Sequence, residues 1–124
     1  MEIKLAKTAG FCFGVNRAVD RLYEIVKSGE KVCTLGPIIH NPQVIEDLKS
    51  KGVVIADSID DIPKDIKLVL RTHGVEKSVI DKLKEKGYEY WDAACPFVKK
   101  IHKIVTDNSD GDTVVLIAGD ENHP

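Results

Sequence analysis

Short apolar segments alternate along the chain with segments whose apolar residues recur at helical spacing. The strand-like segments are residues 3–6, 31–35, 53–56, 66–70, 88–91 and 113–118. The clearest of them is 66–70, because its sequence IKLVL is almost continuously apolar, as in a buried strand. This alternation is typical of a parallel or mostly parallel sheet with helices on its faces. The sequence therefore predicts an α/β fold.

Proline and glycine mark the ends of the predicted helices. The helical patterns begin near Val15, Pro42, Val75 and Pro96, and a glycine (Gly29, Gly52, Gly87) follows each of the first three. The pair Asn41-Pro42 is a favourable start, since the asparagine side chain can cap the helix and proline suits its first turn. The last helix is expected to reach about Thr106.

Length and charge limit the classes of function. The 124 residues suffice for one ordinary α/β domain, or for one complete small lobe and part of another. The net charge is -2 and no basic block is interleaved with aromatic residues, so we expect no nucleic-acid partner. No apolar run approaches the roughly 18 residues of a membrane span. The start MEIKLAKTAGF lacks the apolar stretch of a signal peptide, which favours a cytoplasmic protein.

Two of the three cysteines stand immediately before predicted helices. Cys12 lies in GFCFG and Cys95 in DAACPF. A helix N-terminus offers unpaired N–H groups and positive dipole charge, which favour the thiolate that binds metals. Gly10 and Gly14 let the backbone approach a group held by Cys12. Cys33 lies inside a predicted strand and is interpreted as a small buried hydrophobe, and a disulfide framework is not expected.

Three of the four histidines follow strand-like segments. His40, His73 and His123 each stand within two residues of a glycine or proline, at sharp turns after predicted strands. The carboxyl ends of parallel strands share one edge of a sheet, so these imidazoles can meet in one crevice and bind an oxygen-rich anion. His102 shares a helical stripe with apolar residues and is interpreted as a structural histidine.

A metal centre can be built from these residues in two ways. Zinc remains an alternative, although the usual close ligand pairs such as C-x-x-C are missing. Cys12 and Cys95 lie far apart in the sequence, each at its own helix start. This arrangement fits better with a larger cluster bound where several lobes meet.

The motifs GFCFGV, GPIIHNP, RTHGV, DAACPFV and GDENHP, in this order, closely resemble those of the 4-hydroxy-3-methylbut-2-enyl diphosphate reductase family, the last enzymes of the methylerythritol phosphate route to isoprenoids. The resemblance covers the whole chain but only the N-terminal part of the family pattern. It implies a three-lobed α/β enzyme around a central [4Fe-4S] cluster. By motif, Cys12 and Cys95 match two of three cluster ligands. The same comparison matches His40, His73 and His123 to histidines around the diphosphate substrate.

The resemblance also implies an activity and a division of the chain. Such enzymes reductively remove the substrate's hydroxyl group, releasing isopentenyl and dimethylallyl diphosphates, and take electrons from a ferredoxin- or flavodoxin-type donor. Residues 1–12 would join a lobe absent here, residues 13–95 would form the first α/β lobe, and residues 96–124 would begin a second. The family's proton-relaying glutamate and third cysteine are expected beyond Pro124, so no catalytic residue is assigned and these residues are expected to be inactive by themselves.

Two other classes of function stay open. The chain can be a non-catalytic α/β module that binds an anion or a partner protein. It can also be a redox protein that uses Cys12 and Cys95 as a reversible thiol pair.

Overall fold

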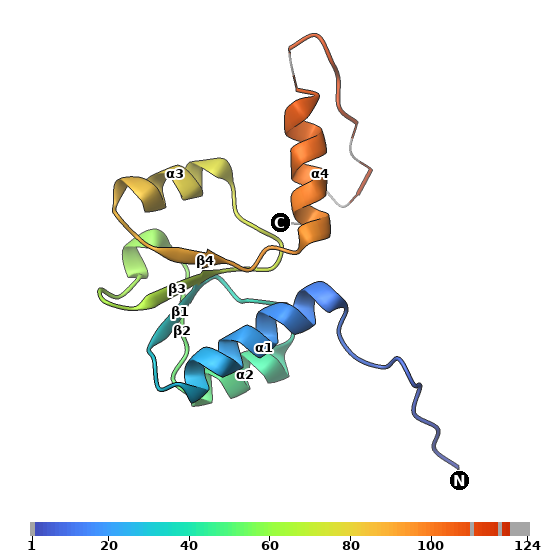
Figure 1. Ribbon diagram of the computed structural model, residues 1–124, viewed down its shortest axis with the longest axis vertical. Coiled ribbons are helices and arrows are strands. Elements are labelled where there is room, and N and C mark those ends of the chain that lie inside the picture. The colour runs from blue at the N-terminus through green and yellow to red at the C-terminus, as the bar shows by residue number, and fades with distance from the viewer. Residues whose placement is uncertain (1, 110, 117, 120–124) are drawn as a thin grey trace.

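A four-stranded parallel sheet forms the centre of the computed structural model, which describes residues 2–109, 111–116 and 118–119. The strands are β1 (Val32–Leu35), β2 (Val54–Ala56), β3 (Lys67–Leu70) and β4 (Tyr90–Asp92), in the spatial order β2-β1-β3-β4. The helices are α1 (Phe13–Lys27), α2 (Pro42–Ser50), α3 (Lys77–Glu85) and α4 (Pro96–Asp107), with a short 3₁₀ helix η1 (Ile59–Asp61). The predicted α/β fold with a parallel sheet is confirmed (Figure 1).

The two central strands divide their side chains between the two faces of the sheet. Val32 and Val69 belong to the apolar cluster on one face, whereas Cys33 and Leu68 belong to the cluster on the other. Because successive side chains of a strand point to opposite faces, a strand that is buried at consecutive positions must be covered on both faces. Figure 1 shows this cover, with α1 and α2 on one side and α3 on the other.

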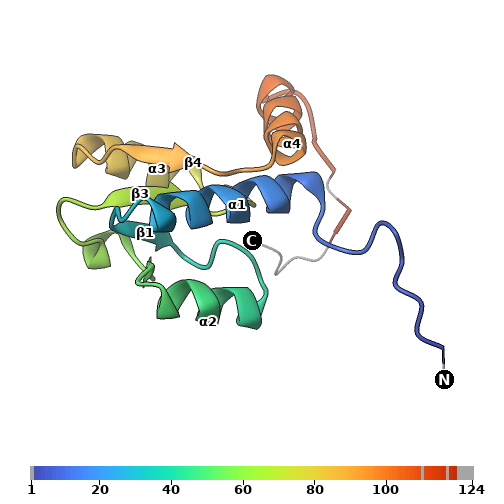
Figure 2. The same ribbon diagram turned by 60° about the horizontal axis from the view of Figure 1, so that its bottom comes forward.

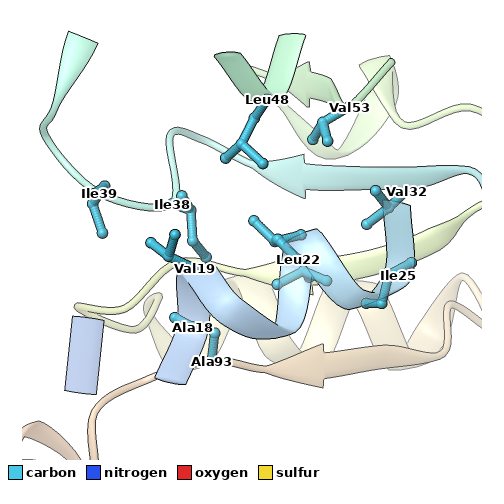
Figure 3. Close-up of a cluster of buried hydrophobic side chains, with 11 residues drawn as sticks. Ala18, Val19, Leu22, Ile25, Val32, Ile38, Ile39, Leu48, Val53 and Ala93 are labelled. Carbon is cyan, nitrogen blue, oxygen red and sulfur yellow. The ribbon is translucent and has the colours of Figure 1, made fainter. Parts of the chain in front are cut away.

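Helix α1 supplies the largest part of the first cluster. Ala18, Leu22 and Ile25 recur at helical spacing and are all buried (Figure 3). Full burial of a leucine such as Leu22 contributes about 1.5–3 kcal/mol. The helix ends at Lys27, and Gly29 then takes a φ of 77°, a left-handed conformation that favours glycine.

The predicted elements differ from the observed ones at several boundaries. Helix α3 begins at Lys77 rather than Val75, and β4 covers Tyr90–Asp92 rather than 88–91. At the start of α2, by contrast, the Asn41 side chain accepts a hydrogen bond of 3.1 Å from the Val44 backbone N–H, as expected from the sequence.

Two predicted strands are not formed. Residues 3–6 lie in an extended N-terminal segment that projects from the body, and Ile3 and Leu5 are 78% and 86% exposed (Figures 1 and 2). The predicted strand 113–118 is likewise absent from residues 113–116 and 118, and Leu116 is 90% exposed. Both predictions were wrong for the same reason. A strand needs a neighbour to pair with, and within the described part of the chain neither segment has one.

Helix α4 also stands apart from the sheet (Figures 1 and 2). All its residues from Pro96 to Asp107 are described, and none of them is buried. Phe97, Ile101 and Ile104 are 71%, 59% and 53% exposed, although an amphipathic helix normally buries its apolar stripe.

Candidate functional site

Cys12 and Cys95 occupy equivalent positions at the starts of two helices. Cys12 is the N-cap of α1 and Cys95 is the N-cap of α4. Their carbonyls accept the first helical hydrogen bonds, from Asn16 N and Lys99 N, each at 2.9 Å. Within the described structure neither thiol caps its own helix, and Cys12 is exposed while Cys95 is half-buried. Both sulfur atoms can therefore take a ligand without giving up a capping role.

The first turn of α1 lies directly against Cys95. Gly14 is buried, and a Cβ atom built on it would lie 2.5 Å from Cys95 Sγ and 2.9 Å from Cys95 Cβ. Any side chain at residue 14 would overlap the cysteine. Because Gly14 follows Cys12 by two residues, this contact brings together two cysteine-bearing turns that lie far apart in the sequence.

The turn before Cys95 is fixed by hydrogen bonds and an ion pair at the end of β4. The Asp92 carboxylate accepts a hydrogen bond of 2.9 Å from Ala94 N and pairs with Lys99 Nζ at 2.6 Å. Cys95 N donates to Thr72 O at 2.9 Å. The position of Cys95 is thus set by β4 and by the loop after β3.

His40 and His73 lie together, one after β1 and the other after β3. Their rings stack with centroids 5.3 Å apart and planes inclined by 17°. Thr72 holds the two loops in register, because its hydroxyl donates to Ile38 O at 3.0 Å and its N–H donates to the same oxygen at 3.3 Å. The structure therefore brings two of the three histidines named above to one edge of the sheet. His123 lies outside the described residues.

His102 is a neighbour of this pair that the sequence interpretation missed. It is exposed rather than packed in an apolar stripe, and its Cε1 atom would lie 3.1 Å from a Cβ atom on Gly74, the residue after His73. Helical periodicity placed His102 among apolar residues but could not show that this face of α4 is turned toward the loop after β3.

Cys33 differs from the other two cysteines. It is fully buried in β1, and its thiol donates a long hydrogen bond of 3.7 Å to Thr34 O. Burial raises the pKa of the Cys33 thiol, an effect partly opposed by a hydrogen bond with the Ala56 backbone. The prediction that Cys33 is a small buried hydrophobe is confirmed.

The described residues do not form a complete metal centre by themselves. Among residues 2–109, 111–116 and 118–119, no group of three or more His, Cys, Asp or Glu side chains could hold a metal ion. Two cavities in this part, of about 840 and 410 Å³, are also lined by neither Cys12, Cys95, His40 nor His73. Of these four residues, Cys12 and His40 are exposed, and Cys95 and His73 are half-buried.

Comparison with known proteins shows what this arrangement is similar to. The sequence profile described as LytB protein matches residues 3–124. The chain belongs to the LytB family. A 4-hydroxy-3-methylbut-2-enyl diphosphate reductase of Thermoanaerobacter pseudethanolicus is 46% identical over 128 residues, which cover 100% of this chain and 44% of that protein. The reductase of the same name from Clostridioides difficile is 39% identical, and the match covers 100% of this chain and 45% of that protein.

Solved structures of LytB relatives share the fold. A structure of (E)-4-hydroxy-3-methyl-but-2-enyl diphosphate reductase, described as the terminal enzyme of the non-mevalonate pathway, superposes with a TM-score of 0.79 at 41% identity, covering 98% of this chain and 43% of the other. A structure of the reductase from Plasmodium falciparum superposes with a TM-score of 0.85 at 28% identity, and the match covers 94% of this chain and 37% of that one. This LytB chain therefore spans less than half the length of these relatives. No helix in the described part is long and apolar enough to cross a membrane.

Proposed function

We propose that this chain is the N-terminal part of a 4-hydroxy-3-methylbut-2-enyl diphosphate reductase, in which Cys12 and Cys95 supply two of three protein ligands to a [4Fe-4S] cluster. The observation that carries the proposal is the contact of Cys95 Sγ with Gly14, which joins the two helix starts. When bound, such a cluster would supply electrons and a Lewis-acidic iron to the substrate's hydroxyl group.

The residues present fit a partial ligand set for this cluster. Two thiols stand at helix N-termini without capping their own helices, and Gly14 leaves room for Cys95 beside α1. Two thiolates are too few for a cubane, so a third ligand must come from elsewhere. The shortage of ligands among the described residues accords with a site completed by the part of the relatives that this chain does not span.

His40, His73 and His123 are proposed to bind the diphosphate of the substrate. The stacked pair of His40 and His73 presents two imidazoles at the edge of the sheet where ligands bind in α/β folds. Imidazole N–H groups can donate to diphosphate oxygens and hold the substrate's anionic end in place. The proton donor for the reaction is expected outside these 124 residues.

The proposal extends to the division of the chain and to its partners. Residues 1–12 join a lobe formed by the remainder of the protein, residues 13–95 form the first lobe, and residues 96–124 begin the second. The exposed N-terminal segment and the uncovered α4 support this division. A ferredoxin- or flavodoxin-type protein of the cytoplasm is proposed as the electron donor.

An activity assay tests the proposal. The 124-residue chain is compared with a chimera that continues it with the remaining part of the Thermoanaerobacter pseudethanolicus relative, both reconstituted without air and supplied with a chemical reductant. The chimera should convert the hydroxylated diphosphate, and the short chain should be at least about 10²-fold slower, since positioned proton transfer alone contributes that much. An inactive chimera that folds and holds iron, or a short chain as fast as the chimera, would contradict the proposal.

A further inference from the structure

Arg17 connects the two cysteine-bearing turns. It lies on α1 one turn after Gly14, so both residues share the helix face that meets the segment before Cys95. Its Nη2 donates hydrogen bonds to Ala94 O at 3.0 Å and to Ala93 O at 3.4 Å. The guanidinium also lies over the Trp91 ring, 5.6 Å from the centroid. Each of these contacts falls within residues 91–94, immediately before Cys95.

The setting of Arg17 is unusual for an arginine on a helix surface. The side chain is half-buried, and its Nε atom is buried without a hydrogen-bond partner in the part of the chain that the structure describes. Among the same residues no carboxylate pairs with it, whereas Arg21, one turn further along α1, is exposed and pairs with Glu24 at 2.9 Å. Burial of an unpaired guanidinium opposes folding, so an arginine that served only to cover the sheet would be a poor choice here.

We propose that Arg17 is a positioning residue of the cysteine site, which acts through Cys95. Its Nη2 donates to two successive carbonyls while the planar guanidinium lies over Trp91, and the ammonium of a lysine lacks the plane that covers the ring. These contacts fix the backbone of residues 93–94 relative to α1 and so hold Cys95 in the space beside Gly14. Since Cys12 begins the same helix, Arg17 sets the placement of one thiol relative to the other before any metal binds.

This inference rests on the proposed function, which makes Cys95 a ligand, but its test needs no cluster. The metal-free chain is treated with a limiting amount of iodoacetamide, and the alkylation rates of Cys12, Cys95 and Cys33 are measured separately by mass spectrometry of their peptides. The three rates measure different properties. Exposed Cys12 gives the reference rate, half-buried Cys95 shows how firmly its turn is held against α1, and buried Cys33 shows whether the core opens.

The Arg17→Met variant should raise the alkylation rate of Cys95 about tenfold, as expected for the loss of a charge-assisted hydrogen bond. The rates of Cys12 and Cys33 should not change. Arg17→Lys keeps the charge but loses the planar guanidinium over Trp91, so its Cys95 rate should fall between those of the wild type and Arg17→Met. Arg21→Met, the matched control on the exposed face of α1, should behave as the wild type.

Two results would overturn the inference. One is an unchanged Cys95 rate in Arg17→Met, and the other is an equal rise for Cys33 and Cys95, which would indicate a general loss of stability. If Arg17→Met does not fold, the same comparison in Arg17→Lys decides. If Arg17→Met raises the Cys95 rate selectively but the chain fails to take up iron, Arg17 remains a positioning residue of Cys95 and only the proposed iron–sulfur cluster is contradicted.

Discussion

The His40 and His73 rings stack 5.3 Å apart although the two residues belong to different loops, after β1 and β3. The adjacency follows from the topology, because β1 and β3 are parallel neighbours whose carboxyl ends meet at one edge of the sheet. Thr72 then fixes the separation by bonding twice to Ile38 O. The two loops that carry the pair are therefore held together by the buried Thr72.

If this pair binds a diphosphate, each imidazole should contribute measurably to affinity. We expect His40→Ala and His73→Ala each to weaken the binding of inorganic diphosphate about ten- to a hundredfold, because losing a hydrogen bond to a charged group costs about 1.5–3 kcal/mol. Isothermal titration calorimetry measures this, with Gln43→Ala, exposed in the first turn of α2, as the control. Affinities that match the wild type in both histidine variants would remove the anion site.

The contact between Gly14 and Cys95 predicts a stability effect. Gly14→Ala places a methyl group 2.5 Å from Cys95 Sγ, so α1 or the turn before Cys95 must move. We expect the free energy of unfolding to fall by about 1–3 kcal/mol, as for other overpacked sites, measured by urea denaturation. Asp20→Ala, on the exposed side of α1, should change it by less than about 0.5 kcal/mol. Equal stability of the two variants would show that the first turn of α1 does not touch Cys95.

The sequence anticipated the centre of the fold better than its edges. Asn41 and Pro42 encode the start of α2 through local capping chemistry, and the apolar run 66–70 encodes β3 through burial, so both could be predicted. Residues 3–6 have the composition of a strand, but pairing depends on a neighbour that no local pattern specifies. The closeness of Arg17 to Ala93 and Ala94 is likewise a product of packing over more than 70 positions in the sequence.

The apolar face of α4 should contribute little to the stability of this chain. Phe97 and Ile104 are more than half exposed, so Phe97→Ser and Ile104→Ser should each change the free energy of unfolding by less than about 0.5 kcal/mol. Leu22→Ala, a fully buried comparison in α1, should cost about 2–5 kcal/mol. In the chimera with the remainder of a relative, we expect the α4 variants to become destabilising, because the added chain covers this face. Indifference to these substitutions in the chimera would contradict that expectation.

Cys33 should make the fold sensitive to alkaline pH. Burial raises the pKa of its thiol above the ordinary value of 9.0, so above that value the unfolded chain releases a proton that the folded chain keeps. The contribution of the buried, protonated thiol to the free energy of unfolding is complete below pH 9.0. It is lost as the pH rises toward the pKa of Cys33 in the folded chain, by at most about 1.4 kcal/mol per pH unit. Urea denaturation at about pH 8 and about pH 10 should show a smaller alkaline loss in Cys33→Ala than in the wild type. Identical losses would show that another group is responsible.

Iron binding by the cysteine variants tests the central claim most directly. The chain is supplied with ferrous iron and sulfide without air and with an exogenous thiol, and bound iron is measured together with the visible absorption of an iron–sulfur cluster. The account predicts a labile brown species in the wild type and in Cys33→Ala, and its loss in both Cys12→Ser and Cys95→Ser, since a site with two protein thiolates has none to spare. Undiminished colour and iron in either Cys12→Ser or Cys95→Ser would contradict it.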